Sequence, residues 1–94
     1  MGSYSCEILL NDDDEPTLKA IDTLLEFSAE EIKRTRKGRV WEIRVRGRHV
    51  HVDVHECIVG LCAGGKNNED YEVLSELSHQ IVATVGGIAS EPET

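Results

Sequence analysis

The sequence predicts a small α+β domain in which two helices cover one face of a three-stranded mixed sheet. Three observations support this prediction. One stretch alternates apolar and polar side chains at every second position, two others space their apolar side chains as a helix does, and 94 residues suffice for one modest core. The expected order is strand, helix, strand, strand, helix, in a two-layer sandwich formed by residues 1–94 as a single domain.

The alternating stretch runs from Arg39 to Cys57 and predicts a β-hairpin. Its apolar side chains occupy every second position, at Trp41, Ile43, Val45, Val50, Val52 and Val54. Gly47-Arg48 suits a two-residue type II′ turn, because glycine tolerates the positive φ needed at the first central position. This turn sets the register, which is expected to pair Arg46 with His49, Arg44 with His51 and Glu42 with Asp53.

Ahead of the hairpin, the pattern predicts a strand over Tyr4–Leu10 and a helix over Pro16–Lys37. Proline suits the first helical position, and basic residues in the last turn complement the helix dipole. A capping-box pattern at Ser28–Glu31 indicates a break in this helix as an alternative. A right-handed crossover through the helix would place the first strand parallel to a hairpin strand, giving a ferredoxin-like, half-open sheet.

After the hairpin, the apolar segment Cys57–Cys62 is expected either to prolong the second hairpin strand or to line a buried loop. A second helix is predicted from about Asn68 to Val85, ended by Gly86-Gly87. Because the end of this helix is β-branched, a fourth C-terminal strand is its alternative. Residues 89–94 are expected to form a flexible acidic tail, and residues 1–3 fit a vector-derived remnant.

Charge and cysteine content limit the classes of function. The net charge is −8, yet all but two of the ten lysines and arginines lie between residues 33 and 48. This balance argues against general nucleic-acid binding and leaves one local basic region. The three cysteines are an odd number, so we expect reduced thiols and a cytoplasmic protein. No apolar run approaches the length of a membrane span, and no membrane partner is expected.

We expect the solvent-facing side of the hairpin to carry the function. Histidine, arginine and carboxylate side chains on an uncovered sheet face can make directional contacts with a complementary protein. The prediction is therefore a small protein-binding or regulatory module, which neutralises a basic partner or forms a homodimer. The expected partner-binding residues are Glu42, Arg44, Arg46, His49, His51, Asp53 and His55.

Two alternative kinds of site remain open in the same region. A nucleic acid or other polyanion could follow the basic belt, which consists of Lys33, Arg34, Arg36, Lys37, Arg39 and Arg48. A metal ion could bind the polar side of the second hairpin strand, because alternate positions of a strand point the same way. The candidate metal ligands are His49, His51, Asp53 and His55.

Catalysis is not expected. The segment Gly60–Asn67 resembles the glycine-rich loop that holds nucleotide phosphates, but Asn67 stands where that loop needs a hydroxyl. Glu69 and Asp70 follow and would repel phosphates at the start of the helix. We therefore predict no catalytic residues and no cofactor.

Overall fold

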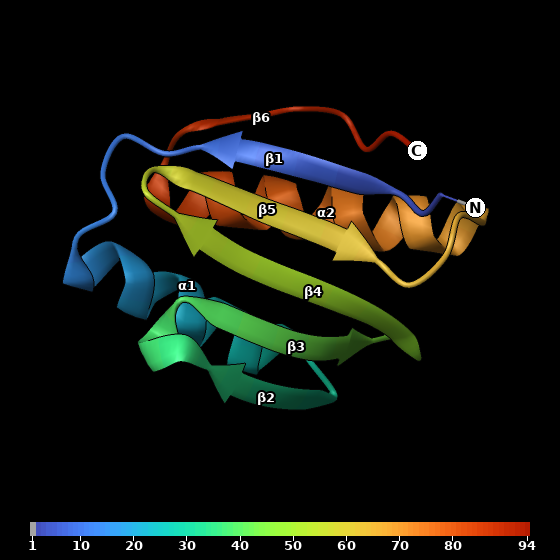
Figure 1. Cartoon of the computed structure of the whole chain (residues 1–94), viewed down its shortest axis with the longest axis horizontal. Helices are drawn as coiled ribbons and strands as arrows, with labels where there is room; N and C mark the ends of the chain where they lie inside the picture. The colour runs from blue at the N-terminus through green and yellow to red at the C-terminus, as the bar shows by residue number, and fades with distance from the viewer. Residues whose placement is uncertain (1) are drawn as a thin grey trace.

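The computed structural model describes residues 2–94, except for the side chain of Arg36, as a six-stranded sheet with two helices on one face (Figure 1). All neighbouring strands are antiparallel, in the order β2-β3-β4-β5-β1-β6. The α+β class is confirmed, but the predicted three-stranded mixed sheet is wrong. Along the chain the elements are β1 (Ser5–Leu9), α1 (Glu15–Ser28), β2 (Glu31–Thr35), the 3-10 turn η1 (Arg36–Gly38), β3 (Val40–Val45), β4 (Arg48–His55), β5 (Ile58–Ala63), α2 (Asn68–Val85) and β6 (Ile88–Ala89).

The segment after the hairpin forms a separate strand, which corrects the expected sheet order. The chain turns at Glu56, whose φ is 54°, and Ile58–Ala63 returns as β5 beside β4. β5 also pairs with β1, so that β1 is antiparallel to its neighbour. The expected parallel pairing is therefore wrong, because β5 lies between β1 and the hairpin. Helix α1 instead carries the chain from β1 to β2 at the far edge of the sheet (Figure 1).

The first helix is shorter than predicted. It begins after Asp14, whose carboxylate accepts a hydrogen bond from the Thr17 amide at 3.0 Å, and it ends at Ser28. The expected break at Ser28 is therefore present, but Glu31–Thr35 then forms strand β2 and no second helix. The side chain of Ile32 is partly buried against the core, while its neighbours in β2 are exposed.

Helix α2 has the predicted bounds, Asn68–Val85, so the alternative of a strand over its β-branched end is wrong. Asn67 and Asp70 form a reciprocal capping box at its start, with distances of 3.2 and 3.1 Å. We expected residues 89–94 to form a flexible tail. In the structure Ile88 and Ala89 form β6, and the main chain of Glu93 exchanges two 2.8 Å hydrogen bonds with that of Ser5.

The hairpin turns one residue earlier than predicted. Its central residues are Arg46 and Gly47, with φ of 51° and 76°, so the turn has the positive φ values of type I′ and not the predicted type II′. The observed register pairs Arg44 with His49 and Glu42 with His51, and the predicted register is wrong by two residues. A shift of two residues leaves the paired strand side chains on their predicted faces, whereas Arg46 moves into the turn.

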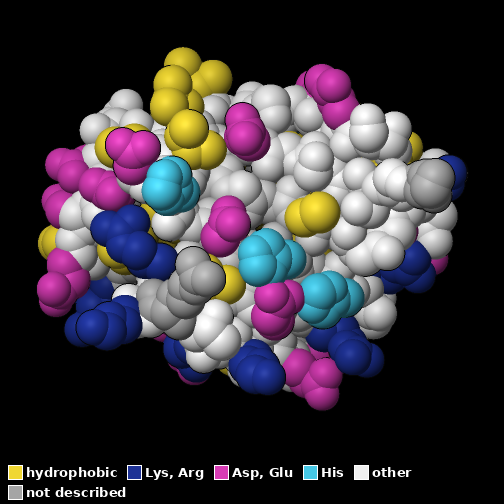
Figure 2. Space-filling model, viewed as in Figure 1, with side chains coloured by type: hydrophobic (Ala, Val, Ile, Leu, Met, Phe, Trp, Pro, Cys, Tyr) yellow, Lys and Arg dark blue, Asp and Glu magenta, His cyan; other side chains and the backbone are white. Residues whose placement is uncertain are grey.

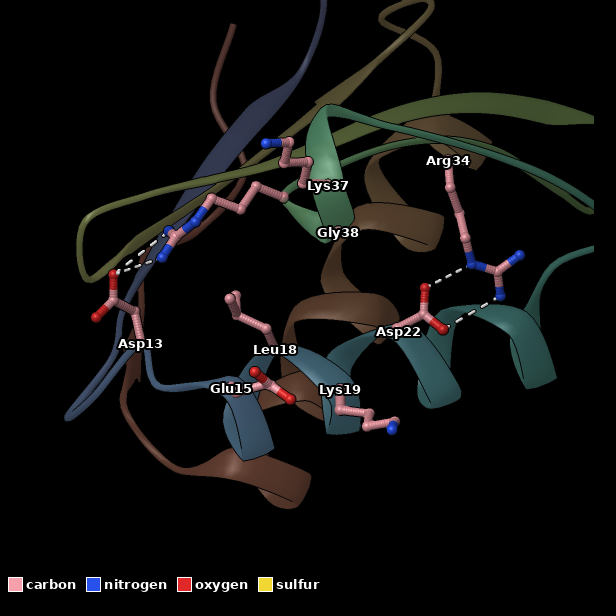
Figure 3. Close-up of a pocket in the computed structure, with 9 residues that line it drawn as sticks. Asp13, Glu15, Leu18, Lys19, Asp22, Arg34, Lys37 and Gly38 are labelled. Carbon is pink, nitrogen blue, oxygen red and sulfur yellow. Dashed lines mark hydrogen bonds and ion pairs between the residues drawn. The ribbon is translucent and has the colours of Figure 1, made fainter.

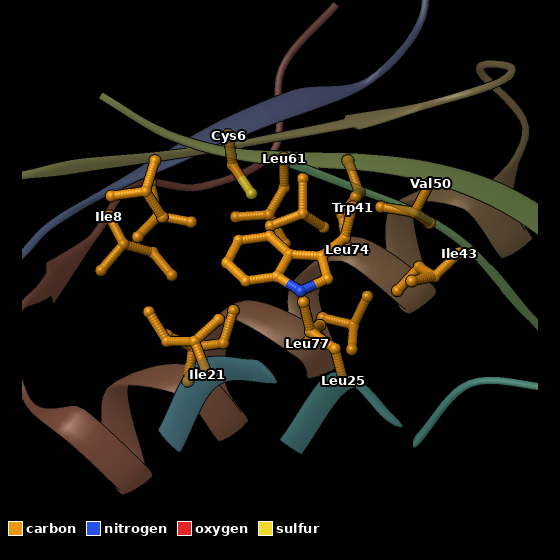
Figure 4. Close-up of a cluster of buried hydrophobic side chains, with 14 of the residues drawn as sticks. Cys6, Ile8, Ile21, Leu25, Trp41, Ile43, Val50, Leu61, Leu74 and Leu77 are labelled. Carbon is orange, nitrogen blue, oxygen red and sulfur yellow. The ribbon is translucent and has the colours of Figure 1, made fainter. Parts of the chain in front are cut away.

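The core lies between the sheet and the helices (Figure 4). Trp41 is fully buried at its centre, and its indole Nε1 donates a 2.8 Å hydrogen bond to Asp22 on α1. Within residues 2–94, neither helix is both long enough and apolar enough to cross a membrane. The largest fully buried side chains are Trp41, Ile8, Ile21, Leu25, Ile43, Leu61, Leu74, Leu77 and Ile81.

Candidate functional site

The candidate site is the face of the sheet opposite the helices, which we call the open face. Figure 2 shows histidine side chains beside acidic ones on this face and a group of apolar side chains at its upper left. Antiparallel pairing sets these side chains in rows across the strands, because residues directly opposite one another point to the same side. The open face consists of Ser5, Glu7, Leu9, Glu31, Lys33, Thr35, Val40, Glu42, Arg44, His49, His51, Asp53, His55, Ile58, Gly60, Cys62, Ile88 and Glu93.

One row crosses the middle of the open face, and we call it the central row. Its members are joined pairwise by the strand register from one edge of the sheet to the other. The row is basic at its β2 end and acidic at its other end, where the C-terminal segment lies beside β1. In order, the central row is Lys33, Glu42, His51, Cys62, Ser5 and Glu93.

Histidine and carboxylate side chains form a network of contacts on β3 and β4. Glu42 Oε1 lies 2.8 Å from His49 Nε2, while Glu42 Oε2 contacts His51 Nδ1. The other ring nitrogen of His51 lies 3.6 Å from Asp53 Oδ2. Because each side chain is restrained by its neighbour, this network presents polar groups to solvent in a fixed arrangement.

The ends of the central row carry opposite charges, which no ion pair of the described residues neutralises. Arg44 is paired with Glu31, with a distance of 3.2 Å. Within residues 2–94, neither Lys33 nor Glu93 forms an ion pair, and both residues are exposed. Lys33 and Arg44 line a depression of about 340 Å³ over β2 and β3, together with Glu31 and Glu42. This depression therefore presents charges of both signs, and Lys33 is its exposed cation at the end of the central row.

A second row on the open face is apolar. The register places Ile58 beside Leu9, and Leu9 beside Ile88. Their exposed fractions are 41%, 57% and 74%, respectively. His55 pairs with Ile58 and ends this apolar row on β4. Three large exposed apolar side chains in one row are a feature of sites that bind other proteins.

The apolar row was not predicted from the sequence. The segment Cys57–Cys62 was expected to prolong the second hairpin strand or to line a buried loop, although Ile58, Gly60 and Cys62 alternate with Val59 and Leu61. That alternation was the available signal, because a strand with one glycine among three same-side residues need not be buried on both faces. For Ile88 no local signal exists, since its position depends on pairing with β1.

A shallow depression of about 210 Å³ lies between the apolar row and the histidine network, over Gly60 and Cys62. Glycine is needed there, because a Cβ on Gly60 would lie 2.7 Å from Asp53 Oδ1. Below the depression, burial raises the pKa of the Cys6 thiol to about 11. A thiol with this pKa is protonated at neutral pH and is a poor nucleophile.

Most arginines of the predicted sites lie on the helical side of the sheet. Arg46, which we expected on the open face, contacts Glu76 of α2 at 2.9 Å. This placement follows from the turn, because Arg46 is one of its two central residues. Three arginines of the basic belt are also paired with carboxylates: Arg34 with Asp22 (2.7 Å) and Glu26 (3.0 Å), Arg39 with Asp13 (3.3 Å), and Arg48 with Asp70 (2.9 Å).

Two of these ion pairs lower the pKa of their carboxyl groups. Hydrogen bonds from the Arg34 guanidinium hold the pKa of Asp22 below its usual value, and those from Arg48 do the same for Asp70. Figure 3 shows Arg34 and Asp22 beside an open groove of about 520 Å³, between α1 and the β2–β3 connection. Lysine and carboxylate side chains both line this groove, so that it presents charges of both signs.

The structure divides the predicted basic belt between two surfaces. Lys33 belongs to the open face, whereas Arg34 and Arg48 contact carboxylates on the helices. The exposed Lys37 lies in the 3-10 turn, with φ of 52°. The side chain of Arg36 lies outside the described part of the chain. The belt residues described therefore form no continuous basic stripe.

The four predicted metal ligands are spread along β4. His49 and His51 contact Glu42, whereas His55 lies at the opposite end of the strand, 3.6 Å from Glu56. Among residues 2–94, no three side chains of histidine, cysteine, aspartate or glutamate are grouped so as to hold a metal ion.

Comparison of the chain with protein-family models, with curated proteins and with solved structures found no match. The chemistry of the open face is therefore the basis on which a function can be argued. This face combines an apolar row, a network of fixed polar groups, and exposed charges of opposite sign at the two ends of the central row.

Proposed function

We propose that this protein is a non-enzymatic protein-binding module and that the open face is its contact surface. The observation that carries the proposal is the apolar row beside the histidine–carboxylate network on an uncovered sheet face. Protein interfaces combine apolar contacts with hydrogen-bonding groups in this way. The proposed contact residues on the hairpin are Glu42, Arg44, His49, His51, Asp53 and His55, to which we add Leu9, Ile58 and Ile88.

The apolar row would supply most of the binding free energy. Leu9, Ile58 and Ile88 still expose large parts of their side chains. Covering side chains of this size contributes on the order of 1 kcal/mol each, because apolar area is removed from water. The polar network would supply specificity, because a partner must match the donors and acceptors that Glu42 and the histidines fix in place.

The proposal is tested by comparing two aspartate substitutions of exposed apolar residues. Ile58→Asp places a charge in the apolar row. Phe27→Asp is the matched control, because Phe27 is 89% exposed on α1, in the helical layer. Proteins retained by each tagged chain from source-cell extract are identified, purified and titrated against the wild type and both variants.

The expected result is a partner that binds the wild type and Phe27→Asp with similar affinity, and Ile58→Asp at least tenfold more weakly. Thermal unfolding of each variant confirms that the fold is retained. A partner that binds all three chains equally, or that is lost equally with both substitutions, would contradict the assignment of the open face.

A further inference from the structure

We infer that the open face binds a second copy of this chain, packed face to face about a twofold axis that runs along the strands between β4 and β5. This inference rests on the proposed function and names the partner. Three features of the open face support it: the size of the face, the charges at the two ends of the central row, and the position of the apolar row.

The size of the face suits one partner of equal dimensions. The molecule measures 33 × 25 × 21 Å, and the open face is seen along the shortest axis (Figure 1). An outline of 33 × 25 Å encloses about 650 Å² as an ellipse. A standard interface takes about 800 Å² of accessible surface from each partner, which is more than a flat outline because side chains roughen the surface. A stable complex would therefore cover nearly the whole face, and a second six-stranded sheet does so.

The charges of the central row are self-complementary under this twofold. The axis divides the six strands equally, so that β2 of one copy faces the β6 side of the other. Lys33 and Glu93 are the two ends of the same row. Each Lys33 would therefore face the Glu93 of the second copy, and the contact would occur twice. At each end, the C-terminal segment that carries Glu93 would lie over the β2 edge that carries Lys33.

The orientation of the axis follows from these charges. A twofold across the strands would place β2 against β2 of the other copy and would bring the two Lys33 side chains to the same edge. Like charges at that edge repel, and both Glu93 carboxylates would meet at the opposite edge. The twofold along the strands makes both contacts attractive.

The same axis covers the apolar row. Ile58 and His55 are paired across the axis, on β5 and β4. Each Ile58 would therefore lie over the His55 of the second copy, and Leu9 would lie toward the end of the opposing β3, where Val40 is partly exposed. Two sheets packed face to face stand about 10 Å apart, so side chains from both copies would meet between them.

Sedimentation velocity of the full chain from 5 µM to 500 µM tests the inference. The expected species is a dimer of twice the 10.5 kDa chain mass. Ile58→Asp and, independently, Ile88→Asp should each weaken self-association at least tenfold. Phe27→Asp should leave it unchanged. Ile88 is 74% exposed at the sheet edge, so its substitution keeps the test valid if Ile58→Asp fails to fold.

A charge exchange tests the orientation. Lys33→Glu and Glu93→Lys should each weaken the dimer several-fold, since each substitution acts at two symmetric contacts, and the double exchange should restore wild-type affinity. A wild-type chain that stays monomeric at 500 µM, a dimer insensitive to both isoleucine substitutions, or a double exchange without recovery would overturn the inference. If the wild type is monomeric but binds a different protein, and Ile58→Asp weakens that binding, the inference fails and the proposed function stands.

Discussion

The Asp53 side chain lies across β5 at Gly60, where an added Cβ would stand 2.7 Å from Asp53 Oδ1. The two residues are direct neighbours in the register of β4 and β5. Asp53 in turn lies 3.6 Å from His51, so this glycine determines how the carboxylate is placed within the histidine network. The position of the Asp53 carboxylate on the open face thus requires that residue 60 has no Cβ.

Substitution of Gly60 by alanine should displace Asp53 and leave the fold intact. The Asp53 carboxylate can rotate away, and alanine also reduces the chain entropy lost on folding, so the free energy of unfolding should change by less than about 1 kcal/mol. In an Asp53→Ala background the same substitution should stabilise the protein by roughly 0.5 kcal/mol. Urea unfolding of the four chains measures this coupling, and additive effects would show that Gly60 and Asp53 do not interact as described.

Asp70→Ala should destabilise the protein by about 2 kcal/mol, because it removes the α2 capping box and leaves Arg48 without its carboxylate. Asp70 is 1% exposed, so water cannot readily replace it. Glu69→Ala, one residue earlier on the same helix turn, is the control and should cost less than about 0.5 kcal/mol. Equal losses in thermal unfolding would disprove this role for Asp70.

Stability should fall in acid below about pH 4. The folded state holds the pKa of Asp22 and of Asp70 below the ordinary value of 3.8, mainly through hydrogen bonds from Arg34 and Arg48. A carboxyl with a depressed folded pKa contributes stability above its unfolded pKa, and that contribution is lost as the pH falls through the folded pKa. Urea unfolding between pH 7 and pH 2 should show this loss. In the double variant Asp22→Asn/Asp70→Asn, the free energy of unfolding should depend less steeply on pH. An unchanged acid slope in the double variant would refute the assignment.

Cys6 should be the least reactive of the three thiols. It is buried against the helices, and burial raises its pKa to about 11, so little thiolate forms at pH 7.5. Cys57 and Cys62 are partly exposed. Maleimide labelling of the native protein followed by peptide mass analysis should modify Cys6 only after unfolding. Native labelling of Cys6 at the rate of Cys62 would be inconsistent with the packing of β1 against the helices.

Trp41→Phe should cost about 1–2 kcal/mol, because it removes the hydrogen bond from the indole to Asp22 and leaves a small cavity. Asp22 would keep its contact with Arg34. In a double-mutant cycle with Asp22→Ala, which removes the acceptor, the loss should therefore be less than additive. Thermal and urea unfolding of the three variants measure this coupling, and full additivity would argue against the hydrogen bond.

Local sequence patterns determined several elements of this protein. The bounds of α2 follow from the Asn67 cap, the helical spacing of apolar residues and the Gly86-Gly87 stop. The two faces of the hairpin follow from strict alternation, which survives a shift of register by two residues. These features are readable because the residues that decide them lie within one or two turns of one another.

Other features depended on segments that are distant in the sequence. Glu31–Thr35 continues a plausible helical pattern, yet pairing with β3 makes it a strand. Ile58–Ala63 becomes a separate strand because it pairs with β4 on one side and, on the other, with β1, some fifty residues earlier in the chain. The apolar row likewise exists only where β5, β1 and β6 meet.

The sequence alone therefore determined the α+β class, the second helix and the polar face of the hairpin, whereas the tertiary structure decided the six-stranded order and the full extent of the open face. The tertiary structure also divided the basic belt between two surfaces, since Arg34, Arg39 and Arg48 contact carboxylates on or just before the helices. The physical reason is the range of the interactions: caps and periodicity act over a few neighbouring residues, while strand pairing and ion pairs join whichever segments the folded chain brings together.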